Sequence, residues 1–153
     1  MRAKLPRGRG LWPAFWMLGS GFPRLDWPFC GEIDVMEYLG HQPRLSYGYV
    51  HGPGSLSDEG VGGEHRSRSS LADGFHVFAA DWSAAEISFS VDGRIFETVR
   101  RGDYPPGQTW AFDRRMFLLV NLAVGGEWPG QPSRKTRFPA RMTVDWIRIW
   151  KAA

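Results

Sequence analysis

The clearest structural pattern in the chain is the stretch EISFSVDGRIFETV at residues 86–99. Its first six residues alternate between polar and apolar side chains, as expected for a strand with one buried face. Asp92 and Gly93 follow, and this dipeptide supplies the two positive-φ positions of a tight hairpin turn. The stretch therefore predicts a hairpin of two antiparallel strands over residues 86–91 and 94–99.

Short runs rich in β-branched and aromatic residues continue on both sides of this hairpin, separated by many of the 19 Gly and 11 Pro. Phe117 to Val124 is almost continuously apolar, which predicts a strand buried on both faces. Residues 52–70 are mostly polar and predict a long loop. No segment of ten or more residues shows a helical stripe of apolar residues, so the pattern predicts an all-β sandwich. The remaining strands are expected over residues 11–18, 32–39, 45–51, 75–82, 116–124 and 142–151.

The composition excludes several classes of protein. The 153 residues suit one domain, and 42% hydrophobic with 23% charged residues excludes collagen, coiled coils and disordered tails. No apolar run approaches the ~20 residues of a membrane-spanning helix, and the residues after Met1 show no signal-peptide pattern. A single cysteine, Cys30, excludes an internal disulfide. The net charge of +3 comes from scattered basic residues, which argues against a nucleic-acid partner.

Three acidic residues lie close together in the stretch GEIDVMEY at residues 31–38. Side chains alternate between the two faces of a strand, so Glu32 and Asp34 share one face. Glu37 would lie on the opposite face of a regular strand. A β-bulge near Met36 would return Glu37 to the face of the other two acids, and bulges are frequent beside active sites.

Carboxyl groups on one face suit the retaining hydrolysis of glycosidic bonds. That reaction needs an ionised nucleophile and a protonated general acid about 5–5.5 Å apart, and crowding of like charges can keep one carboxyl ionised while raising the pKa of another. The residues alone leave three readings open: a catalytic pair, a solvated strand face carrying acids, and a metal cluster. Aromatic residues that could line a cleft favour the catalytic pair, although each could instead belong to the core: Trp12, Trp16, Trp27 and Trp128.

The stretch EIDVME at residues 32–37 resembles the active-site signature of glycoside hydrolase family 16, in the bulged form of its laminarinase-like members. The resemblance covers nearly the whole chain in the family's order. The other stretches that carry it are GLWPAFWML at 10–18, WPFCG at 27–31, VHGP at 50–53, residues 77–93 with Asp81-Trp82 and Val91-Asp92-Gly93, NLAVGGEWPG at 121–130 and VDWIRIW at 144–150. The resemblance implies one catalytic domain over residues 1–153, with a β-jelly-roll sandwich fold of the concanavalin A-like type and a substrate cleft across its concave sheet.

The resemblance also implies a reaction, the retaining endo-hydrolysis of β-1,3-glucans such as laminarin or of mixed-linkage β-1,3-1,4-glucans. By motif position, Glu32 corresponds to the nucleophile, Asp34 to an assisting acid and Glu37 to the acid/base, and catalysis needs no cofactor. Two further tryptophans, Trp82 and Trp146, are expected to pack in the core. Positions of the substrate cleft correspond to Trp12, Trp16, Trp27, His51, Asn121 and Trp128.

The chain departs from the family at its N-terminus. The family's catalytic domain has several strands before the segment that begins here at Arg2, so the resemblance implies an N-terminally truncated domain with uncovered sheet edges. The family often binds a structural calcium ion through its N-terminal region and an acid of the last strand, to which Asp145 corresponds. A β-glucan polysaccharide is the implied partner, with no membrane partner. The implied protein is a monomer that is extracellular or at the cell surface.

Two rival functions share this fold. One is a non-catalytic glucan-binding module, which typically lacks one of the two glutamates. The other is a transglycosylase, which keeps the same catalytic residues and differs in its acceptor site.

Overall fold

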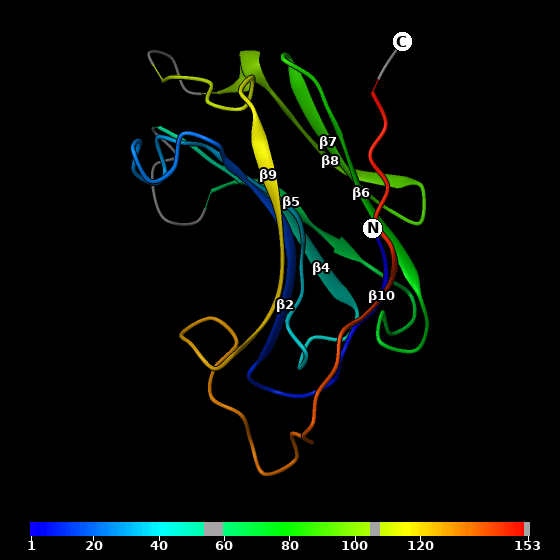
Figure 1. The fold of residues 1–153 in the computed structure, drawn as a ribbon. Helices are drawn as coiled ribbons and strands as arrows, with labels where there is room; N and C mark the ends of the chain where they lie inside the picture. The colour runs from blue at the N-terminus through cyan, green and yellow to red at the C-terminus, as the bar shows by residue number, and fades with distance from the viewer. Residues whose placement is uncertain (54–59, 105–107, 152–153) are drawn as a thin grey trace.

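The computed structural model describes residues 1–53, 60–104 and 108–151 as a sandwich of two antiparallel five-stranded sheets (Figure 1). The first sheet has the order β10 (Thr143–Trp146), β1 (Arg2–Lys4), β6 (His76–Trp82), β7 (Glu86–Val91), β8 (Arg94–Arg100). The second has the order β5 (Val61–Arg66), β4 (Leu45–His51), β3 (Glu32–Glu37), β2 (Leu11–Gly19), β9 (Met116–Val124). The described residues contain a single helical turn, the 3₁₀ turn Arg101–Asp103, and none of them forms a helix able to cross a membrane. The all-β sandwich is confirmed.

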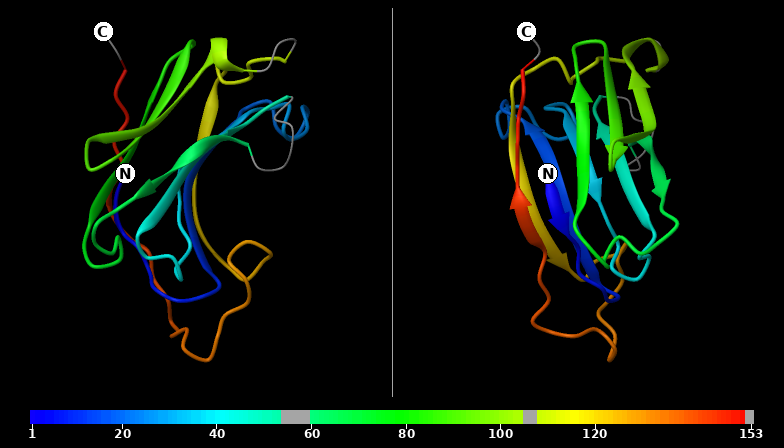
Figure 2. Two further views of the ribbon diagram at one scale, coloured as in Figure 1. Left: turned by 180° about the vertical axis from the view of Figure 1, so that it is seen from behind. Right: turned by 90° about the vertical axis from the view of Figure 1, so that its right-hand side faces the viewer.

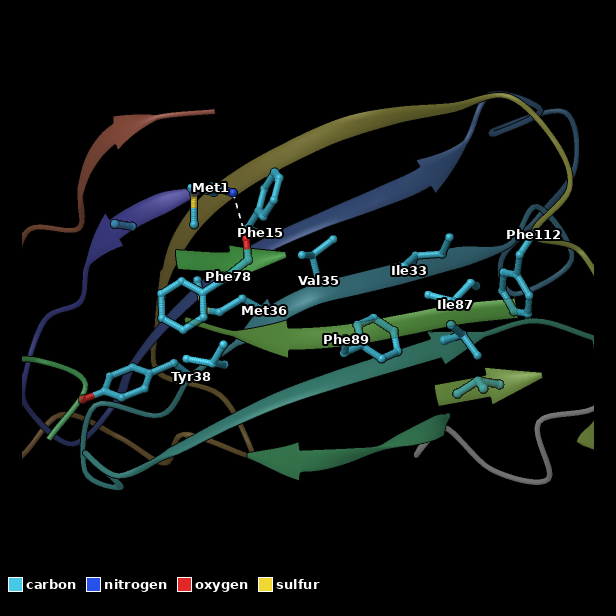
Figure 3. Close-up of a cluster of buried hydrophobic side chains, with 14 of the residues drawn as sticks. Met1, Phe15, Ile33, Val35, Met36, Tyr38, Phe78, Ile87, Phe89 and Phe112 are labelled. Atoms are coloured by element: carbon cyan, nitrogen blue, oxygen red, sulfur yellow. Dashed lines mark hydrogen bonds between the residues drawn. The ribbon is translucent and has the colours of Figure 1, made fainter. Parts of the chain in front are cut away.

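The hydrophobic core fills the space between the two sheets (Figure 3). Ile87 and Phe89 of β7 are fully buried there, as their alternation with polar residues predicts. Gly48 of β4 lies directly opposite, and a Cβ atom at this position would come within 2.6 Å of the Phe89 ring. Glycine is therefore required for the sheets to approach closely at this point.

The predicted hairpin is confirmed. β7 pairs antiparallel with β8, and the turn between them contains Asp92 with φ 50° and Gly93 with φ 77°. These are the positive-φ positions that a tight two-residue hairpin turn requires.

Two strands were not predicted, and two predicted strands end earlier than expected. The short strand β1 was not predicted, and β5 lies within the loop expected at residues 52–70. The loop prediction is therefore wrong for β5, and its residues 54–59 lie outside the described residues. β5 carries only one β-branched residue and two glycines, so it lacks the usual strand signal. The strand expected at 32–39 ends at Glu37, and the strand expected at 142–151 ends at Trp146.

The expectation that residues 117–124 are buried on both faces is wrong. None of the nine residues of β9 is buried, because β9 lies at the edge of the second sheet and Val124 is 53% exposed. Trp82 was expected in the core but is 40% exposed, and its indole N–H donates to the carbonyl oxygen of Phe112. Trp146 is half-buried, with the Arg148 guanidinium stacked on its ring.

Candidate active site

The predicted β-bulge lies in the middle of β3. Asp34 and Glu37 pair with Tyr49 and Tyr47 of β4, so three steps along β3 match two steps along β4. The side chains of Val35 and Met36 both pack into the core although they are consecutive (Figure 3). The extra residue turns Glu37 to the face that carries Glu32 and Asp34, away from the other sheet.

The two glutamates are held by hydrogen bonds from neighbouring tryptophan side chains. The Trp27 indole N–H donates to Oε2 of Glu32 at 3.0 Å, and the Trp12 indole N–H donates to Oε1 of Glu37, also at 3.0 Å. Asp34 and Glu37 are buried, and Glu32 is half-buried. The acids therefore lie in a partly desolvated site. This excludes the hypothesis that they simply decorate a solvent-exposed face of the strand.

Burial raises the pKa of all three carboxyl groups. Desolvation, followed by repulsion from Asp34, raises the pKa of Glu32 to about 7. The same two causes raise the pKa of Glu37 to about 8. Desolvation also raises the pKa of Asp34, and its hydrogen bond with Glu32 opposes the rise. Both glutamates therefore keep their protons to higher pH than an exposed glutamate does, as the general acid of a retaining pair must.

A cleft of about 920 Å³ lies over the acids on the outer face of the second sheet. Glu32 and Glu37 line this cleft, whereas the buried Asp34 is not among its lining residues. In Figure 2 (left), the segment between β2 and β3 and the segment after β9 both project on this side of the sheet. Of the predicted substrate residues, the cleft is lined by Trp12, Trp27, His51 and Trp128.

The other two predicted substrate residues contact each other beside the cleft. The Trp16 indole N–H donates to Oδ1 of Asn121 at 2.7 Å, between neighbouring strands β2 and β9. Trp16 pairs with Asp34 across β2 and β3, so it shares the face of the acids, but it is not among the residues that line the cleft. This pair borders the cleft along the sheet.

The predicted metal ligand Asp145 binds an arginine in the structure. Oδ2 of Asp145 lies 2.6 Å from Nη1 of Arg2 on the neighbouring strand. Among the described residues, the group of three His, Cys, Asp or Glu that could hold an ion is formed instead by Glu32, Asp34 and His51. The residues around Asp145 thus offer a poor fit to a calcium ion, which wants six to eight oxygen ligands, and calcium binding there stays a prediction.

Five residues that line the cleft were not predicted from the sequence: Tyr49, Gly60, Val61, Gly62 and Glu127. Tyr49 lies two residues before His51 on β4 and faces the same side, so the alternation of the strand could have identified it. Glu127 also lines the cleft from the segment after β9. No periodic signal identifies Glu127, because that segment is neither helix nor strand.

Comparisons with known proteins agree with this geometry. The model of the family described as glycosyl hydrolases family 16 matches residues 1–148. The "Beta-glucanase" of Rhodothermus marinus is 38% identical over 99% of this chain and 56% of its own length. The crystal structure of an endo-β-1,3-glucanase from Pyrococcus furiosus matches with 46% identity and a TM-score of 0.89, over 92% of this chain and 55% of that one.

A laminarinase catalytic domain from Thermotoga maritima is similar to the same degree, with 43% identity and a TM-score of 0.89 over 92% of this chain and 58% of that one. The chain spans about half the length of these relatives. The family model and the two solved structures cover nearly all of it. The chain therefore belongs to glycosyl hydrolase family 16.

Proposed function

We propose that the protein containing this chain hydrolyses β-1,3-glucosidic bonds within laminarin-type or mixed-linkage β-1,3-1,4-glucans, with retention of configuration. The observation that carries the proposal is the position of Glu32 and Glu37 on one face of β3, in one cleft, where burial and the charge of Asp34 raise the pKa of both. A retaining glycosidase needs one ionised and one protonated carboxyl group of this kind.

In the proposed first step, the Glu32 carboxylate attacks the anomeric carbon and forms a covalent glycosyl ester. Glu37 gives its proton to the departing glycosidic oxygen as the bond between that oxygen and the anomeric carbon breaks. In the second step, Glu37 takes a proton from water, the water attacks the anomeric carbon, and Glu32 is released. The hydrogen bonds from Trp27 and Trp12 hold the two carboxyl groups in place for these steps.

Asp34 acts in this proposal as a positioning residue for Glu32. Its hydrogen bond with Glu32 orients the nucleophile, and its charge raises the pKa of both glutamates. His51 lies against Asp34, with Nε2 3.0 Å from Oδ2, and its ring is 5.8 Å from the Trp27 ring.

The aromatic side chains of the cleft support a sugar polymer as substrate. Trp12 meets Trp128 edge to face at 5.3 Å, and Trp128 lies 5.0 Å from the Tyr47 ring. Large rigid rings of this kind can stack against the apolar C–H faces of sugar rings. Relatives named for endo-1,3-β-glucosidase and endo-1,3-1,4-β-glycanase activity support the two linkages proposed.

We also propose that the protein acts outside the cell or at its surface, as a monomer. The proposal on location follows from the substrate, because a polysaccharide cannot pass through a membrane unaided. Both glutamates are present and oriented, which favours an enzyme over a glucan-binding module. A relative named "Beta-1,3-glucan-binding protein" also aligns with 99% of the chain, so activity has to be measured.

The test is incubation of the protein with laminarin, lichenan and agarose, with an assay of new reducing ends and proton NMR of the products at early times. We expect cleavage of laminarin or lichenan and a new end that is first β-configured. The matched background control is the double variant Glu32→Gln/Glu37→Gln. An initial α product, or equal rates for the protein and the double variant, would overturn the proposal.

A further inference from the structure

A histidine and two acids converge at one end of the cleft. Glu32 and His51 are direct cross-strand partners on β3 and β4, and Asp34 lies two residues further along the same face. One carboxylate oxygen of each acid and one ring nitrogen of His51 all lie within 4.8 Å of one another. These three residues, Glu32, Asp34 and His51, are called the carboxylate–histidine group below.

One acceptor atom of this group has no hydrogen bond. Oδ2 of Asp34 lies 3.0 Å from Nε2 of His51, yet no donor among the described residues reaches it in hydrogen-bond geometry. The Asp34 residue is only 3% exposed. A buried acceptor without a donor costs free energy, and nearly all such atoms in proteins are paired. Two kinds of positive partner can satisfy this oxygen, a protonated His51 or a cation that lies between the oxygen and a neutral His51 ring.

The distances suit a metal ion that takes both nitrogen and oxygen ligands. Zinc binds His nitrogen and carboxylate oxygen at about 2.0–2.2 Å in tetrahedral geometry, so two ligands of one ion are separated by about 3.3–3.6 Å. Asp34 Oδ2 and His51 Nε2 are 3.0 Å apart, so the ring would move away by a few tenths of an ångström to admit the ion. Glu32 is half-buried, and a small turn of its carboxylate would complete three protein ligands with an open position toward the cleft.

The ligand types discriminate between metals. Calcium and magnesium prefer six or more oxygen ligands, whereas an imidazole beside carboxylates favours zinc and other late first-row divalent ions. A divalent cation would also relieve the repulsion among three carboxyl groups that share one buried face. These arguments favour a borderline divalent cation over a hard one.

We propose that the carboxylate–histidine group binds a borderline divalent cation of the Zn²⁺ type, and that the bound ion blocks the cleft. The proposal of metal binding rests only on the geometry of this group. The proposal of inhibition rests also on the proposed function, in which Glu32 must attack the substrate. A metal ion bound to one oxygen of Glu32 withdraws negative charge from the carboxylate, which weakens it as a nucleophile toward the anomeric carbon.

The first test is isothermal titration of the purified protein with ZnCl₂ in a buffer that does not chelate metals. The matched variants are His51→Gln and His41→Gln, since His41 is an exposed histidine outside the group. We expect one site in the protein and in His41→Gln, no measurable site for CaCl₂, and roughly 100-fold weaker zinc binding in His51→Gln. Thermal unfolding confirms that each variant is folded.

Equal zinc affinity in the protein and in His51→Gln would overturn the metal site, as would loss of the site in His41→Gln. The second test is laminarin hydrolysis with added ZnCl₂ and then with excess chelator. We expect inhibition at the zinc concentration that fills the titrated site, and recovery with chelator. Zinc that binds through His51 without inhibiting would overturn the block. A metal-free protein that is inactive on every glucan would contradict the proposed function, and the titration would still decide the metal site.

Discussion

Strands β3 and β9 belong to the same sheet and are separated only by β2, yet their environments are opposite. β3 has three acids among its six residues, and five of the six are buried. β9 has no charged residue among nine, and none of the nine is buried. β3 pairs on both sides, with β2 and β4, whereas among the described strands β9 pairs only with β2. Neighbouring strands, rather than a strand's own composition, therefore determine its burial.

The largest effect is expected at Glu32, on the cleft face of β3. Glu32→Gln keeps the size of the side chain but cannot attack the anomeric carbon, so we expect a loss of laminarin hydrolysis on the order of 10⁴-fold or more. Binding of laminarin oligosaccharides, measured by titration, should remain. The control is Glu64→Gln on β5, an exposed site outside the cleft. Activity of Glu32→Gln within tenfold of the parent would reject Glu32 as the nucleophile.

The core face of β3 and the edge strand β9 offer a matched pair of valines. Val35 is 5% exposed and Val124 is 53% exposed. Val35→Ala removes two buried methyl groups and leaves a cavity, so we expect a loss of about 2 kcal/mol in the free energy of unfolding. Val124→Ala should change it by about 0.5 kcal/mol or less. Urea unfolding of the two variants measures the difference, and equal losses would refute the contrast between the strands.

The raised pKa of Glu37 predicts an effect of pH on stability. This carboxyl group has an ordinary pKa of 4.5 and a pKa of about 8 when folded, so between these values the folded state holds more protons than the unfolded state. The contribution of this group to the free energy of unfolding is therefore fully present below the ordinary pKa of 4.5. It is lost as the pH rises through the folded-state pKa of about 8. Glu37→Gln removes the loss, and we expect it to raise the free energy of unfolding by on the order of 1 kcal/mol at pH 8.

Thermal unfolding of the protein and of Glu37→Gln from pH 4 to pH 9 checks this sign. Glu64→Gln again serves as the exposed control. The melting temperatures of the parent and of Glu37→Gln should agree at low pH, and that of Glu37→Gln should become the higher one as the pH rises. A Glu37→Gln variant that is less stable than the parent at pH 8 would show that the carboxyl group is not strained by its burial.

The smallest expected effect is at Asp34, which has no direct contact with the cleft. Asp34 raises the pKa of both Glu32 and Glu37 by its charge. Asp34→Asn should therefore shift both limbs of the pH profile of kcat/KM toward lower pH, by on the order of one unit. A merely structural role would lower the activity without moving the limbs, and a shift to higher pH would contradict the electrostatic role.

The features that follow from local pattern could be predicted from the sequence. Alternation and the Asp92-Gly93 turn predict the β7–β8 hairpin, and the five-residue spacing of Glu32 and Glu37 predicts the bulge. Features that depend on distant neighbours could not be predicted. The exposure of β9 depends on its place in the sheet order, and β5 forms by pairing with β4 despite its two glycines. The Trp16–Asn121 contact likewise depends on strand order, which is not encoded locally.

The most direct test of the separate roles of Glu32 and Glu37 is chemical rescue by azide. The variants are Glu32→Ala and Glu37→Ala, and the substrate is a β-1,3-linked glucoside with a good leaving group, such as dinitrophenolate. In Glu32→Ala, azide should take the place of the carboxylate and give the α-glycosyl azide. In Glu37→Ala, the ester on Glu32 should still form, and azide should open it to give the β-glycosyl azide. The same anomer from both variants, or no rescue of either, would contradict the assignment.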